Sequence, residues 1–172
     1  FNQFADNARA RLATHLGRTD FGSDNLMERD YLRANARAIA NTSIFADART
    51  GAADIPVAFP NTKLADQLQT VAEAIQIRTQ LGVSRQIFYV TIGGFDTHSI
   101  QPEVMPGLQQ DINDSIMAFR SAMQALGEWN NVTLFTATEF GRTLIDNGDG
   151  TDHGWGGHQF VAGGSVNGQQ IY

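Results

Sequence analysis

Apolar residues recur at helical spacing in two stretches of this chain. The first stretch runs from about residue 62 to residue 81, where Gly82 is a suitable residue to close a helix. The second covers residues 105–126, keeps its apolar stripe for about six helical turns, and is followed by Gly127. The pattern therefore predicts two amphipathic helices. The stripe of the first consists of Leu64, Leu68, Val71 and Ile75.

Two continuous apolar runs, rich in β-branched and aromatic residues, flank the second helix. Residues 86–92 precede it and residues 132–137 follow it, and each run is typical of a strand buried on both faces. Strand, long helix and strand form a βαβ unit, whose two strands should be parallel with a right-handed crossover. Residues 160–162 and 171–172 are further short strand candidates.

The first part of the chain reads as a helical scaffold. Asn25, with Glu28 three residues later, resembles a capping box, and a long helix is predicted from there to about Ala46. We expect residues 1–172 to be a single-domain fragment, in which residues 1–60 are the scaffold and residues 61–172 carry the βαβ part. The predicted fold is α/β, with three layers in the order helix, sheet, helix and a mainly parallel sheet.

Composition narrows the function classes. The 172 residues carry a net charge of −6 with one lysine and scattered arginines, so the basic face that nucleic acids require is missing. No apolar run reaches the roughly 18 residues of a membrane span. Without any cysteine, thiolate metal sites and cysteine nucleophiles are excluded.

Candidate chemistry begins directly after the first predicted strand, in Gly93-Gly94-Phe95-Asp96-Thr97-His98. Asp96 and His98 are two residues apart, and in an extended loop both can turn to one side as ligands of one metal ion. The glycines would let the backbone approach a ligand closely. The alternative is that Asp96 caps the next helix and His98 bonds to the backbone.

Glu139 and Arg142 follow the second predicted strand. Glu139 is a candidate ligand or general base, and the guanidinium fork of Arg142 suits an anionic substrate. Parallel strands would place this motif at the same sheet edge as Asp96 and His98, where open α/β folds bind ligands. The alternative is an ion pair between Glu139 and Arg142 at the start of a helix.

Asp152, His153 and His158 lie in a glycine-rich segment. Three of the four histidines of the chain thus fall between residues 93 and 158, beside acidic residues. Mixed carboxylate and imidazole ligands suit Zn²⁺ or Mn²⁺ better than Ca²⁺, and one or two ions are expected. The alternatives are a solvated, mobile loop, or a metal-free domain in which these residues form ion pairs.

At these motifs the chain resembles the DUF1501 proteins, a family without an assigned function. The resemblance covers residues 60–172 well and the beginning weakly, and several motifs occur in the right order. The matching runs are Leu64–Ala72, Phe88–His98, Thr138–Arg142, Asn147–Gly148 and Gly150–Gly154. That family is similar to the alkaline phosphatase and sulfatase superfamily, whose members hydrolyse phosphate or sulfate esters with one or two divalent metal ions.

The resemblance implies an alkaline phosphatase-like fold in truncated form. Asp96 and His98 resemble an acid and a histidine ligand of the superfamily, and His153 or His158 resembles its last histidine ligand. Phe140 stands where the superfamily has a further histidine after the position of Glu139. The nucleophile is expected before Phe1, so the remaining segments of a larger protein, before Phe1 and after Tyr172, are expected partners.

The function expected from these observations is hydrolysis of phosphate or sulfate esters, on a small molecule or a polysaccharide, with a divalent metal. The ligands would be Asp96, His98, Glu139, Asp152, His153 and His158. Family members often carry an export signal, which implies a periplasmic or extracellular location. The alternative is a catalytically inactive extracellular binding or assembly protein with a structural metal or none.

Overall fold

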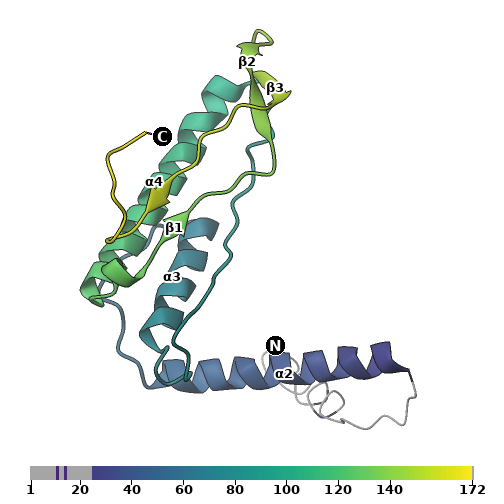
Figure 1. Cartoon of the computed structure of the whole chain (residues 1–172), viewed down its shortest axis with the longest axis vertical. Coiled ribbons are helices and arrows are strands. Elements are labelled where there is room, and N and C mark those ends of the chain that lie inside the picture. Colours follow the sequence, from purple (N-terminus) through teal and green to yellow (C-terminus); the bar gives the residue numbers. More distant parts are fainter. Residues whose placement is uncertain (1–10, 12–13, 15–24, 172) are drawn as a thin grey trace. The chain divides into compact units, whose positions relative to one another are not determined.

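The computed structural model describes Arg11, Thr14 and residues 25–171. Contacts between residues divide the chain into two compact units, Phe1–Ala52 with Thr79–Gly82, and Ala53–Arg78 with Val83–Tyr172. Much of the predicted N-terminal scaffold, before Asn25, lies outside the described residues. The first unit contains α2, and the second contains the remaining named elements (Figure 1).

Helix α2 covers Leu26–Thr50. Asn25 is its N-cap, and the Asn25 side chain accepts hydrogen bonds from the backbone N–H groups of Met27, at 3.0 Å, and Glu28, at 3.4 Å. This satisfies two of the backbone donors that a helix leaves without partners at its beginning. The capping residue was predicted correctly, and the helix extends a few residues past the predicted end. None of its residues is buried.

Helix α3 covers Lys63–Gln76 and begins as predicted, with the hydroxyl of Thr62 accepting from the N–H of Ala65 at 3.3 Å. Its predicted stripe lies on the buried face, where Leu68 is 3% exposed. The helix ends earlier than predicted, at Gln76, and Gly82 lies in the turns that follow with a φ of 66°.

Helix α4 covers Gln101–Ala125. It ends in a Schellman motif, as the glycine predicted: Gly127 has a φ of 71° and donates to the carbonyl of Gln124, and Glu128 donates to that of Met123. Figure 1 shows α3 and α4 side by side. The core of the second unit lies between them and comprises Leu64, Leu68, Ala72, Ile75, Phe119, Ala122 and Met123.

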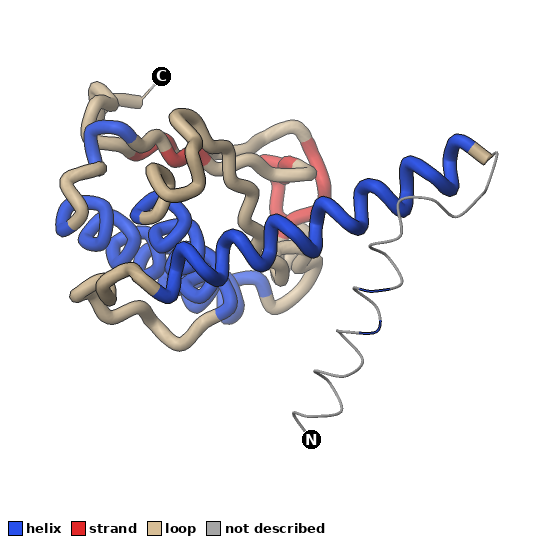
Figure 2. Tube along the Cα trace, turned by 90° about the horizontal axis from the view of Figure 1, so that it is seen from below, coloured by secondary structure: helices blue, strands red, loops and turns tan. Residues whose placement is uncertain are grey.

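The strands differ from the prediction. Strand β1 (Leu134–Phe135) pairs with β4 (Val161–Ala162), β2 (Gly141–Asp146) pairs with β3 (Thr151–Gly154), and both pairs are antiparallel. Figure 2 shows how short these strands are compared with the helices and loops. The prediction of a three-layer, alkaline phosphatase-like fold with a mainly parallel sheet is therefore wrong.

The first predicted strand, residues 86–92, shows why that prediction failed. These residues form no strand, and Val90 and Ile92 pack on the helical core while Ile87 is 100% and Tyr89 85% exposed. The side chain of Gln67 in α3 bonds to both backbone groups of Thr91, at 2.9 Å and 3.0 Å, where a neighbouring strand would bond. The segment is thus buried on one face by helices instead of on two faces within a sheet.

The turn between β2 and β3 is the Asn-, Asp- and Gly-rich stretch that its composition indicates. The side chain of Asp146 accepts from the N–H of Gly148 at 3.0 Å, and Asn147 donates from its backbone to the carbonyl of Gly150 at 3.0 Å. This local hydrogen bonding closes an antiparallel hairpin. Arg142 therefore lies in a strand and not at the beginning of a helix, which the sequence had allowed.

The short 3₁₀ helix η1 covers Trp129–Asn131 and connects α4 to β1. Within the described part of the chain, no helix combines the length and the apolar character needed to cross a membrane.

Candidate metal centre

The hairpin and the loop before α4 meet at the beginning of that helix. Asp149, in the hairpin turn, accepts from the backbone N–H of Ile100 through its carboxylate at 2.9 Å and from the N–H of Gln101 through its carbonyl at 3.1 Å. A carboxylate at a helix N-terminus is favourable because it faces unpaired N–H groups and the positive end of the helix dipole. These bonds fix the hairpin beside residues 96–98.

The loop itself is shaped by one of its two glycines. Gly94 has a φ of 93°, a backbone conformation that residues with a side chain rarely adopt. A Cβ atom there would lie 3.3 Å from a methyl group of Leu108 in α4. The loop therefore packs tightly on α4 just before Asp96. Gly93 has no such constraint.

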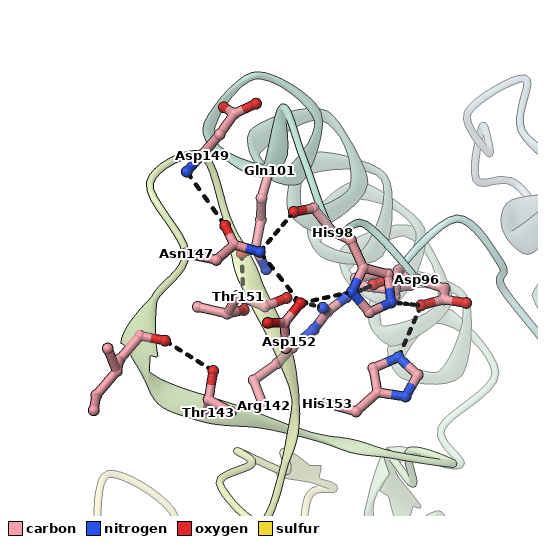
Figure 3. Close-up of polar contacts among 12 residues, drawn as sticks. Asp96, His98, Gln101, Arg142, Thr143, Asn147, Asp149, Thr151, Asp152 and His153 are labelled. Carbon is pink, nitrogen blue, oxygen red and sulfur yellow. Dashed lines mark hydrogen bonds and ion pairs between the residues drawn. The ribbon is translucent and has the colours of Figure 1, made fainter.

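Asp96, His98 and His153 form a compact cluster (Figure 3). Oδ1 of Asp96 lies 3.0 Å from Nε2 of His98 and 2.8 Å from Nε2 of His153. One ligand atom from each residue lies within 4.8 Å of the others. Two imidazole nitrogens and one carboxylate oxygen at this spacing are suited to bind one divalent metal ion.

Asp152 lies behind His98, on the side away from Asp96. Its Oδ1 is 3.0 Å from Nδ1 of His98 and accepts from the side chain of Asn147 at 3.2 Å. Asn147 also donates to the backbone carbonyl of His98 at 3.0 Å. A carboxylate on the second nitrogen of a ligand histidine fixes its tautomer and ring orientation, which is the role this geometry suits.

The electrostatics of the cluster follow from these bonds. The hydrogen bond to Asp152, followed by the nearby charges of Asp96 and Asp152, raises the pKa of His98 above its ordinary value. The pKa of Asp96 is lowered, chiefly by the hydrogen bond to His153. That of Asp152 is lowered by its hydrogen bonds to His98 and Asn147. Both carboxylates therefore keep their charge to a lower pH than carboxylates without such hydrogen bonds.

Access to the cluster is open. The side chains of Asp96, His98 and His153 are 64%, 51% and 47% exposed. A structural zinc site is closed by four protein ligands, whereas a catalytic site keeps a position for water or substrate. A metal centre formed by these three exposed side chains would be of the second type.

The other candidate residues are not part of this group of three ligand atoms. Glu139 and His158 are exposed, and neither belongs to the group of metal-competent atoms found among the described residues. Arg142 is half-buried and donates from its two terminal nitrogens to the backbone carbonyls of Phe95 and Thr151. Its assignment to a substrate anion stays a prediction.

Two neighbours of the cluster were not predicted to contribute. Asn147 was named only as part of a run that matches the resembled family, and the sequence holds no sign that its amide would contact Asp152. Phe140, noted only because it replaces a histidine, stacks on the ring of His153 with centroids 4.2 Å apart and planes at 14°. The only sign of this contact in the sequence was the position of Phe140 between the charged residues Glu139 and Arg142.

Comparison with known proteins gives a family and no function. No curated protein and no solved structure matches the chain. No comparison links it to the alkaline phosphatase and sulfatase superfamily. The model of DUF1501, described as a protein of unknown function, matches residues 9–172. Because this match covers nearly the entire sequence, the chain belongs to the DUF1501 family.

Proposed function

We propose that this protein is a metal-dependent hydrolase of phosphate or sulfate esters, with one divalent ion held by Asp96, His98 and His153. The observation that carries the proposal is the convergence of three ligand atoms within 4.8 Å of one another at an exposed position. The donor set of two imidazoles and one carboxylate suits Zn²⁺ or Mn²⁺.

The charge of this centre favours an anionic substrate. A divalent ion with one carboxylate and two neutral imidazoles keeps a net positive charge, in a chain whose net charge is −6. Such an ion lowers the pKa of a bound water molecule and stabilises negative charge on the ester group. The residues contribute geometry: Asp96 joins both rings, and Asp152 holds His98 with Nε2 towards Asp96.

The proposal is tested with metal-free protein and protein reconstituted with Zn²⁺ or Mn²⁺, assayed on p-nitrophenyl phosphate, bis(p-nitrophenyl) phosphate and p-nitrophenyl sulfate. We expect turnover that requires metal, disappears in His98→Ala and persists in His158→Ala. Stoichiometric metal binding without turnover of any ester would overturn the hydrolase. Absence of metal binding would overturn the metal centre as well.

A binding or assembly role is the second candidate, and exposed apolar side chains favour it. Ile87 and Tyr89 point outward from an extended segment, and Phe135 is 70% exposed. Large apolar side chains exposed in this way are available for contact with a partner. The ester assay separates the two candidates, because an assembly protein would turn over no ester, whether or not it binds a metal ion. For either role we propose a periplasmic or extracellular location, from the family resemblance alone.

Asp152→Asn is expected to weaken metal affinity about 10- to 100-fold while leaving the fold intact. The amide keeps the size of the side chain but removes the negative charge that makes the imidazole of His98 a stronger metal ligand. The measurement is a competitive Zn²⁺ titration with a chromophoric chelator. Asp114→Asn serves as the control, because Asp114 is a partly exposed carboxylate of α4 that accepts hydrogen bonds from Gln110 and Asn113 on the same helix. Equal affinity in wild type and Asp152→Asn would contradict the role given to Asp152.

Metal affinity is expected to fall as the pH is lowered. The metal binds the deprotonated imidazole, so protons compete with it, and affinity is full above the pKa of His98 and lost below it. Because Asp152 raises that pKa, the loss should begin at a higher pH than for an ordinary histidine, whose pKa is about 6.5. Titrations between pH 5.5 and 8.5 would check this, and an affinity independent of pH would contradict it.

A further inference from the structure

Arg142 ties together the two segments that carry the cluster. Its Nη2 donates to the carbonyl of Phe95, the residue directly before Asp96. Its Nη1 donates to the carbonyl of Thr151, the residue directly before Asp152. Figure 3 shows the Arg142 side chain extending from the hairpin towards Asp152. The two terminal nitrogens thus bind protein carbonyls on both sides of the site.

A second path leads from Arg142 to the cluster through an aromatic ring. The guanidinium carbon of Arg142 lies 5.1 Å from the centre of the Phe140 ring, within the range of a cation–π contact. The same ring stacks on the imidazole of His153, with ring centroids 4.2 Å apart. Phe140 therefore connects the guanidinium with one of the two histidines.

The backbone of Arg142 is itself fixed in place. Its N–H donates to the carbonyl of Gly156 at 2.6 Å, and its carbonyl accepts from the N–H of Gly156 at 3.0 Å. Arg142 also stands opposite His153 in the antiparallel register of β2 and β3. A fixed backbone lets the two terminal nitrogens of the side chain hold the loop before α4 and strand β3 in a constant relative position.

We propose that Arg142 is a positioning residue that holds Asp96 and His153 at metal-binding distance by clamping the carbonyls of Phe95 and Thr151. A planar guanidinium can reach two separate acceptors with fixed geometry, which a lysine ammonium cannot reproduce. The clamp is independent of the ester chemistry. It rests on the proposed metal centre only where metal affinity is its readout.

The test compares Arg142→Gln and Arg142→Lys with wild type in two measurements. In metal-free protein, NMR records the ring protons of His153, which the face of Phe140 shifts upfield, and the backbone amide of Asp96. In a Co²⁺ titration, the visible absorption spectrum records both the affinity and the coordination geometry. Arg120→Gln is the matched control, because Arg120 is an exposed arginine of α4.

Arg142→Gln is expected to move the His153 ring signals towards the values of an unstacked histidine, to shift the Asp96 amide, and to weaken Co²⁺ binding about 10- to 100-fold with a changed spectrum. Arg142→Lys should show the same changes in the His153 ring signals and in the Asp96 amide. Arg120→Gln should match wild type. Should Arg142→Gln fail to fold, Arg142→Lys carries the same comparison.

Unchanged His153 and Asp96 signals in the Arg142 variants would overturn the clamp whatever the cobalt result. Full restoration by lysine would overturn it too, because charge and not the fork would then be sufficient. A wild-type protein that binds no Co²⁺ would overturn the proposed function alone, and the metal-free NMR comparison would still decide the clamp.

Discussion

Alanine in place of Asp96 is expected to weaken metal binding by at least about 100-fold and to abolish ester hydrolysis. Oδ1 of Asp96 is the atom that both histidine rings approach, at 3.0 Å and 2.8 Å, so its removal takes away a ligand and the link between the other two. The measurements are isothermal titration with Zn²⁺ and the metal-dependent turnover of an aryl phosphate.

Asp114→Ala is the control for that substitution, since it removes a partly exposed carboxylate from α4 that accepts hydrogen bonds from neighbours on the same helix. It should leave affinity and turnover at wild-type values. Circular dichroism should show the same helix content in both variants. Wild-type affinity in Asp96→Ala would contradict the assignment of Asp96 as a ligand.

Phe119→Ala is expected to lower the free energy of unfolding by about 3–5 kcal/mol. The ring of Phe119 is 2% exposed and lies in the core between α3 and α4, so its removal leaves a cavity among well-packed neighbours. Urea unfolding followed by circular dichroism measures the effect.

Met117→Ala is the matched comparison on the same helix, because Met117 is 47% exposed and fills no core. Its effect should stay within about 0.5 kcal/mol. A loss below about 1 kcal/mol in Phe119→Ala would mean that the two helices do not form the core of this unit.

The helices were predictable because their signals are local. Caps at Asn25 and Thr62, the stripe of α3, and Gly127 after α4 each depend on neighbouring residues only. The end of α3 was missed since the apolar pattern continues past Gln76 while the backbone turns towards Gly82.

The sheet was not predictable from the same information. An apolar run such as residues 86–92 shows that a segment is to be buried but does not show against what. In the structure Val90 and Ile92 pack against the core residues of α3 and α4, and the side chain of Gln67 bonds to the backbone of Thr91. Strand pairing depends on residues far apart in the chain, such as Leu134 and Ala162.

Asp96, His98 and His153 lie together in the structure, but for a different structural reason from the one predicted. Residues 96–98 and the hairpin meet because Asp149 caps α4, not because two parallel strands end at one sheet edge. Sequence spacing could not distinguish His153 from His158, or show that Asp152 faces the far nitrogen of His98. Those distinctions depend on the register of β2 and β3, which the sequence alone leaves open.

The most direct test of the metal centre is the stoichiometry of Zn²⁺ binding to the metal-free chain, measured by isothermal titration for wild type, His153→Ala and His158→Ala. The proposed centre predicts one equivalent in wild type and in His158→Ala, and strongly weakened binding in His153→Ala. No binding to wild type, or equal binding to all three proteins, would contradict the assignment of the cluster as a metal centre.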